Sequence, residues 1–307
     1  AIFQSLPGQW QLTAPASLHY HGQQQRLSVS PHCWQQQASQ LCADKTVVIS
    51  PQQLTTSLTL SQFPLSSVQA VLPYNTIASG SLDAALTANW QQGSPATASL
   101  SVSSNTGSVT TQLATPLTLA WQRLVLNSTL SNNSLQNTLQ LQVDQQAALS
   151  ANVNISNFNQ DNKALSGEIT LKHFTIDFLQ PLLGEFSELT GLAAADIRLS
   201  GSLQQPLLYG SAELQNSRLK GKLAPVDIDN AALAVTFSGQ TASLDGLVST
   251  PKGEINLSGV AQWHQMDAWQ AQLNIKGDEL RLQVPQASLQ IAPDLVLTAN
   301  SQSTRIS

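Results

Sequence analysis

The sequence predicts an all-β fold whose strands follow one another and curl into an elongated groove with an apolar interior. Three observations support this prediction. Apolar and polar residues alternate with a period of two from about Gln52 onward, turn residues such as Asn-Thr-Gly and Pro-Lys-Gly separate the alternating runs, and only 10% of the residues are charged. Period-two alternation is typical of half-buried strands, and abundant Gln, Ser, Thr and Asn suit strands with one wet face.

The strands are predicted wherever the alternation is clear. In chain order, the alternating runs lie at 82–90, 135–143, 147–155, 197–199, 208–214, 233–237, 255–257, 273–275 and 280–284. The runs recur roughly every 10 to 15 residues with turn signals between them, and no second class of element interrupts them for long.

Two cysteines mark a predicted hairpin near the N-terminus. Cys33 and Cys42 flank an eight-residue loop rich in Gln, which can form the tip of a hairpin and bring the sulfurs together. We predict a disulfide, which implies an oxidising compartment such as the periplasm or the cell exterior. Two alternatives stay open: two buried thiols, or a metal site in which His19, His21 and His32 lie beside the cysteines.

One stretch, 177–190, breaks the strand pattern. Asp177 can cap a short helix that carries Phe178, Leu182 and Phe186 on one apolar side, with Gly191 beyond its end. Such an apolar stripe must be covered, so we expect this short helical crossing to lie on the sheet.

An internal repeat relates the middle of the chain to its last part. A shift of 111 residues without gaps aligns Phe63 with Phe174 and Gly80 with Gly191, together with many apolar positions between them. Such a repeat is typical of units that stack their strands to extend one apolar surface. The predicted segments are 1–53, with N-terminal strands and the hairpin; 54–164, the first β-groove repeat; and 165–307, the second, which continues the first.

The inward positions of the predicted strands are mostly Leu, Ile, Val and Ala. Aromatic residues make up 5% of the chain and Met occurs once, which indicates a smooth aliphatic lining and not an interlocked aromatic core. We predict an unroofed trough that accepts acyl chains, since each buried methylene contributes about 0.8 kcal/mol. A closed β-sandwich is the competing architecture. The predicted lining residues are Leu86, Leu139, Leu141, Val153, Ile197, Leu199, Leu214, Leu233, Val235, Phe237, Leu244, Ile255, Leu257, Leu273, Ile275 and Leu282.

Charge and motif content narrow the function classes. The formal net charge is −5 and Lys and Arg form no cluster, which argues against nucleic-acid binding. No stretch approaches the roughly 18 apolar residues of a membrane-spanning helix. Because Asp, Glu and His are sparse and no nucleophile or phosphate-binding arrangement is found, we expect no enzyme, no cofactor and no metal. The strand-like opening without Met leads us to expect a piece of a longer protein.

Several runs of the sequence together resemble the TamB family. They are Gly-Glu-Ile-Thr-Leu-x-x-Phe from Gly167, Leu-Thr-Gly-Leu-Ala-Ala-Ala-Asp-Ile-Arg-Leu from Leu189, Pro-Leu-Leu-Tyr-Gly-Ser-Ala-Glu-Leu from Pro206, and Ala-Pro-Asp-Leu-Val-Leu-Thr-Ala from Ala292. The resemblance extends from about residue 165 to 307 and weakens toward the N-terminus.

The resemblance implies a β-taco, or repeating β-groove, and a hydrophobic channel for phospholipid between the inner and outer membranes. It also implies support of outer-membrane protein assembly with TamA, an Omp85-type barrel, which would bind mostly through regions outside this chain. On this view the chain is a periplasmic C-terminal portion, and an N-terminal inner-membrane anchor lies outside it. Two other functions stay open: a scaffold that templates strands of outer-membrane or autotransporter clients through an open sheet edge, and an adhesin stalk.

Overall fold

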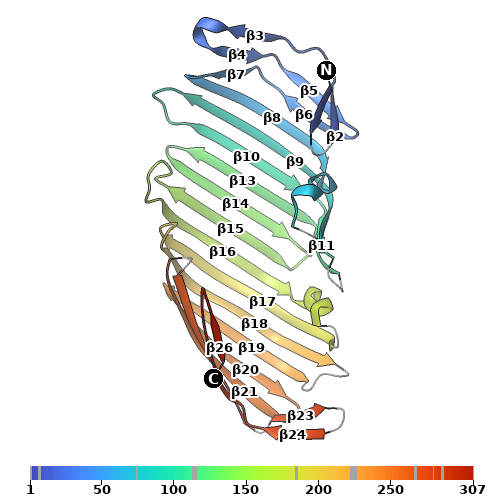
Figure 1. Ribbon diagram of the computed structural model, residues 1–307, viewed down its shortest axis with the longest axis vertical. Helices are drawn as coiled ribbons and strands as arrows, with labels where there is room; N and C mark the ends of the chain where they lie inside the picture. The colour runs from blue at the N-terminus through green and yellow to red at the C-terminus, as the bar shows by residue number, and fades with distance from the viewer. Residues whose placement is uncertain are drawn as a thin grey trace. The chain divides into compact units, whose positions relative to one another are not determined.

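The structure, a computed structural model, consists almost entirely of antiparallel β-strands (Figure 1). The all-β class predicted from the alternation is therefore confirmed. In the described part, no helix is long and apolar enough to cross a membrane. The described residues are 2–5, 8–73, 75–112, 116–183, 186–221, 227–265, 268–278, 280–284 and 287–306.

The chain folds into two compact units. The first holds residues 1–145 and 150–161, and the second holds residues 146–149 and 162–307. The segment boundaries predicted from the sequence, at 53 and 164, stay predictions.

The first unit is a series of antiparallel strands with a 3-10 helical crossing between β8 and β9. Strand β9 bends at Gly80, where φ is +108° and an added Cβ would lie 2.5 Å from the Thr106 carbonyl oxygen. Before the bend β9 pairs with β11, and after it with β8 and β10. The elements are β1 (Ile2–Ser5), β2 (Gly8–Leu12), β3 (Leu18–His21), η1 (Gly22–Gln24), β4 (Arg26–Val29), β5 (His32–Gln36), β6 (Ser39–Ala43), β7 (Val47–Ser50), β8 (Gln53–Pro64), η2 (Leu65–Val71), β9 (Thr76–Gln91), β10 (Thr97–Ser104), β11 (Gly107–Thr111), β12 (Leu117–Trp121), β13 (Arg123–Ser131), β14 (Ser134–Gln142) and β15 (Ala148–Ser156), which belongs to this unit from residue 150.

The second unit is a meander. Strands β16 to β22 pair in chain order, β25 and β26 extend the series, and β23 and β24 form a separate hairpin. The elements are β16 (Ala164–Thr175), η3 (Asp177–Leu183), β17 (Phe186–Gly201), β18 (Pro206–Gly221), β19 (Ile228–Gly239), β20 (Thr241–Thr250), β21 (Gly253–Gln265), β22 (Ala268–Asp278), β23 (Leu280–Val284), β24 (Ala287–Ile291), β25 (Asp294–Asn300) and β26 (Thr304–Ile306).

Elements of the two units correspond when the chain is shifted by the offset of the sequence repeat. After a shift of 111 residues, the first and last positions of β8 coincide with those of β16. Both are irregular at the same place, because Gln62 and His173 adopt left-handed φ values of 51° and 44° just before Phe63 and Phe174. An extra residue of this kind bends a strand, so each unit turns its chain toward the crossing by the same device.

The crossing in the second unit is shorter than the sequence predicted. The expected helix over 177–190 is a 3-10 helix that ends at Leu183, and β17 already begins at Phe186. Pro181 lacks the N–H that a longer helix would use, while the chain from Phe186 finds backbone partners on β18. The crossing does lie on the sheet, since the rings of Phe174 and Phe178 meet edge to face at 5.7 Å.

The predicted disulfide is present. Cys33 on β5 and Cys42 on β6 are directly opposed in the hairpin, and their sulfurs are bonded. Neither cysteine is therefore available as a thiolate ligand. Among the described residues, no group of three or more His, Cys, Asp or Glu is arranged to hold a metal ion.

Fully buried side chains are few among the described residues. In the first unit, Trp10 stacks on Phe63 with ring centroids 6.5 Å apart, and the Trp121 indole donates to Ser104 Oγ at 3.2 Å. Elsewhere, the extensive contacts in the described part join hydrogen-bonded neighbours or a helical crossing with its adjacent strand. The alternating apolar side chains of both units are mostly only part-buried, which is not the sealed core of the closed sandwich that was the competing architecture.

Candidate functional site

One face of the sheet in the second unit carries mainly apolar residues and glycine from β17 to β25; an exception is Ser217, which is directly opposed to Ala231 and is 6% exposed. Directly opposed residues of antiparallel strands point to the same face, so the pairings define rows of side chains across the strands. One such row runs Ala195, Ala212, Val235, Leu244, Gly259, Leu273 and Leu297. The predicted lining residues on this face are Ile197, Leu199, Leu214, Leu233, Val235, Phe237, Leu244, Ile255, Leu257, Leu273 and Ile275.

Most apolar side chains of this face are part-buried and keep some exposed surface. Leu257 is half-buried, whereas its strand neighbours Asn256 and Ser258 point to the other face and are exposed. Only a few members, such as Leu199 at 9% exposure, are closed off by their own neighbours. We refer to this surface, in either unit, as the apolar face.

Glycines on the apolar face make room for the side chains of neighbouring strands. Gly246 lies between Leu233 and Leu257 in one row, and a Cβ there would fall 2.5 Å from Leu233 Cδ2 and 3.3 Å from Leu257 Cβ. The leucine side chains thus occupy the space that a side chain at 246 would need. Beside this row the surface is hollowed by a cavity of about 390 Å³, whose lining includes Leu244 and Leu273.

The first unit has a similar apolar face. Leu86 on β9 lies between Leu58 and Leu100. Leu139 and Leu141 on β14 face Leu126 and Leu124 on β13. Val153 on β15 is half-buried. The predicted residues of this unit therefore lie where aliphatic side chains gather.

A polar pair interrupts this face, and the sequence prediction missed it. The row that runs through Leu86 and Leu100 continues to Ser128 and Asn137, which are directly opposed on β13 and β14. Both side chains are half-buried. The sequence does mark this pair by a break in the alternation, because Asn137 occupies a position at which the pattern of Leu135, Leu139 and Leu141 predicts an apolar residue.

Leu282 is placed differently from the other predicted residues. It lies on β23, which pairs with β24 in a two-stranded sheet and not with the sheet that carries the apolar face.

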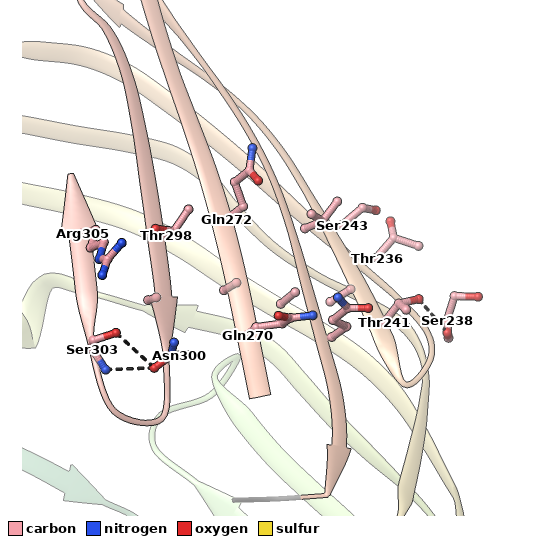
Figure 2. Close-up of a pocket in the computed structure, with 16 residues that line it drawn as sticks. Thr236, Ser238, Thr241, Ser243, Gln270, Gln272, Thr298, Asn300, Ser303 and Arg305 are labelled. Atoms are coloured by element: carbon pink, nitrogen blue, oxygen red, sulfur yellow. Dashed lines mark hydrogen bonds between the residues drawn. The ribbon is translucent and has the colours of Figure 1, made fainter. Parts of the chain in front are cut away.

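The opposite face of the second unit is polar. A hollow of about 730 Å³ lies over β19 to β22, β25 and β26, and its labelled side chains end in hydroxyl and amide groups except Arg305 (Figure 2). Several of these groups hydrogen-bond locally, as when Ser303 Oγ and its backbone N–H both donate to Asn300 Oδ1. The two faces therefore differ in chemistry, although the opposite face also exposes Leu247 at 39% and Val260 at 62% among its polar side chains.

Charged side chains of the second unit, such as Asp196, Arg198 and Asp245, are exposed on the face opposite the apolar one. The two ion pairs in the described part join Arg218 to Glu188 at 3.9 Å and Lys220 to Asp229 at 3.6 Å, and all four side chains are about half-exposed. The apolar face between β17 and β25 carries no ionisable side chain.

Comparison with known proteins identifies the family. Residues 1–214 match the family model described as "TamB, N-terminal domain". The translocation and assembly module subunit TamB of Haemophilus influenzae is 23% identical over 293 residues, which cover 95% of this chain. The chain spans 22% of the length of that relative. No solved structure matches the chain. The matching model is that of the N-terminal domain, so the expected C-terminal position is not confirmed. Because the match covers well over half of the chain, the chain belongs to the TamB family.

Proposed function

We propose that the apolar faces bind phospholipid acyl chains in the periplasm, and that the chain thereby helps conduct lipid between the inner and outer membranes. The observation that carries the proposal is the aliphatic face in each unit, whose side chains are part-buried and still partly exposed to solvent. Contact of such a surface with water is unfavourable. Each lipid methylene that is buried on it contributes about 0.8 kcal/mol of binding free energy. The uncharged lining offers few directional contacts, so a bound chain can slide.

The setting of the protein supports this proposal. A disulfide fits an oxidising compartment such as the periplasm. The relative from Haemophilus influenzae is a subunit of a translocation and assembly module. We therefore propose that the protein acts within such a module, with TamA as its outer-membrane partner, and supports outer-membrane protein assembly.

Site-specific photo-crosslinking tests the lipid proposal. A photoreactive amino acid replaces Leu257 in one variant and Ser258 in another, so that the two probes sit on one strand but on opposite faces. After incubation with phospholipid vesicles and irradiation, we expect phospholipid adducts at 257 and none at 258, detected by mass spectrometry of the intact protein. Leu86 and Thr87 provide the same matched pair in the first unit.

The crosslinking result can contradict the proposal in two ways. Absence of lipid at both 257 and 86 would remove the evidence for lipid binding. Equal labelling of both faces would indicate nonspecific adsorption to the sheet.

A second candidate function is strand templating, and the first unit offers a place for it. Strand β3 pairs on one side with β4 and has no other strand partner in the described part. Its side chains are all exposed, including Leu18 at 65% and Tyr20 at 63%. An exposed edge of this kind can pair with an extended client segment.

The two functions make opposite predictions for the same variants. Tyr20→Pro removes a backbone N–H from the edge, so it should weaken capture of an extended outer-membrane-protein peptide and leave lipid adducts at 257 unchanged. Leu233→Asp places a carboxylate on the apolar face and should abolish those adducts without weakening peptide capture. Loss of lipid adducts in Tyr20→Pro would show that the two sites are not independent.

A further inference from the structure

Ser128 and Asn137 are a directly opposed polar pair within the aliphatic face of the first unit. Ser128 Oγ donates to Asn137 Oδ1 at 2.5 Å, and Asn137 Nδ2 donates to the backbone carbonyl of Val153 at 3.3 Å. The pair is therefore fixed in position by strands on both sides of β14.

The hydrogen-bonding capacity of this pair is not used up. An Asn amide nitrogen carries two N–H groups, and only one of them, the donor to Val153, has a partner in the described part of the chain. Both side chains are half-buried and not sealed, so the second N–H of Asn137 can be reached from the apolar face.

The surroundings of the pair decide what can use that N–H. On the same face, Leu126 and Leu139 lie on one side of the pair along the strands, and Leu130 and Leu135 lie on the other. A hydrocarbon segment that covers the pair takes the N–H out of water without replacing its hydrogen bond, which is unfavourable. A carbonyl oxygen at this point replaces that bond, while the flanking leucines receive the hydrocarbon on either side.

We propose that Ser128 and Asn137 form a subsite for the ester carbonyl of a glycerolipid, which sets the position at which the lipid pauses on the apolar face of the first unit. The proposal rests on the lipid-binding function proposed above and adds a recognised chemical group to it. On the apolar face of the second unit the polar residue Ser217 is buried, at 6% exposure, so it offers a lipid no open hydrogen-bonding group of this kind.

Ester and ether lipids separate this proposal from general hydrophobic binding. A diester phospholipid and its diether analogue share chain length and headgroup, but only the diester has carbonyl oxygens. We expect the protein, incubated with vesicles that hold the two in equal amounts and then reisolated, to retain about five-fold more diester, which corresponds to one neutral hydrogen bond. Mass spectrometry of the extracted lipid gives the ratio.

Two variants assign the preference to this pair. Ser128→Ala combined with Asn137→Leu replaces the pair by apolar side chains like those around it, and should bring the ratio to about one while total bound lipid is kept. The control, Thr87→Val with Ser99→Ala, removes a hydroxyl pair with a 2.6 Å contact on the opposite face of the same unit, and should keep the ratio of the unaltered protein. Circular dichroism checks that both variants fold.

The outcomes are distinct. If neither lipid is retained by the unaltered protein, the lipid-binding function itself fails. If both lipids are retained equally, the function stands and the ester subsite is overturned, and this result does not depend on any variant folding. A preference that persists in Ser128→Ala with Asn137→Leu also overturns the subsite.

Discussion

At the residue scale, glycines leave room on the sheet for large side chains on the neighbouring strands. Gly210 sits between Ile197 and Phe237 on the apolar face of the second unit. Its φ is +120°, and an added Cβ would lie 2.0 Å from the Asp196 carbonyl oxygen. This position therefore excludes any side chain for two reasons, backbone conformation and contact with a neighbouring strand.

We expect Gly210→Ala to lower the free energy of unfolding by about 3 kcal/mol. Gly93→Ala is the matched control, because Gly93 also has a positive φ, +84°, but nothing lies within 4 Å of its added Cβ. The control should cost only about 1 kcal/mol, the penalty of the left-handed conformation. Urea denaturation followed by circular dichroism measures both, and equal losses would show that the close contact at 210 is relieved by movement.

At the element scale, the hairpin of β5 and β6 depends on its disulfide. Cys42 and Ala43 are buried, and β6 continues the sheet by pairing with β8. The crosslink restricts the unfolded chain across a short loop, which in the chain-entropy account stabilises the fold by roughly 2–3 kcal/mol.

Cys33→Ala combined with Cys42→Ala should therefore reduce the hydrogen-exchange protection of β5, β6 and β8. Strands β20 and β21 of the second unit serve as the internal control and should keep their protection. Reduction of the unaltered protein with a thiol should reproduce the effect. Unchanged protection of β6 in both experiments would mean that packing alone holds the hairpin.

The crossings show which element-scale predictions the sequence supports. Alternation predicts the position of a strand well, because it depends only on residues within that strand. The end of the crossing after Asp177 was misplaced because the segment from Phe186 suits either a helix or a strand. Its choice depends on β18, which supplies the backbone partners from more than 20 residues away.

At the scale of the whole molecule, the protein is held together by backbone pairing and apolar contact and hardly by charge. Only 10% of its residues are charged, and the two ion pairs among the described residues are exposed. Exposed pairs contribute about 0–1 kcal/mol each and are screened by salt.

Thermal stability should accordingly respond little to ionic strength. Between 50 and 300 mM sodium chloride we expect the free energy of unfolding to change by no more than about 1 kcal/mol. Sodium sulfate at the same ionic strength should raise the melting temperature, since it strengthens apolar burial. Differential scanning calorimetry provides both measurements. A large loss of stability in sodium chloride would contradict the prediction and indicate stabilising ion pairs beyond these two.

The sequence by itself determined the fold class and the disulfide partners, and it indicated which apolar residues of a strand share one side, because alternation and cysteine spacing are local properties. Only the tertiary structure decided which strands pair and in which register. Register placed Leu257 beside Gly246, set Asn137 opposite Ser128 within a row of leucines, and assigned Leu282 to a separate hairpin. The physical reason is that backbone pairing joins residues distant in sequence, and a period of two identifies the face of a strand but not its neighbour.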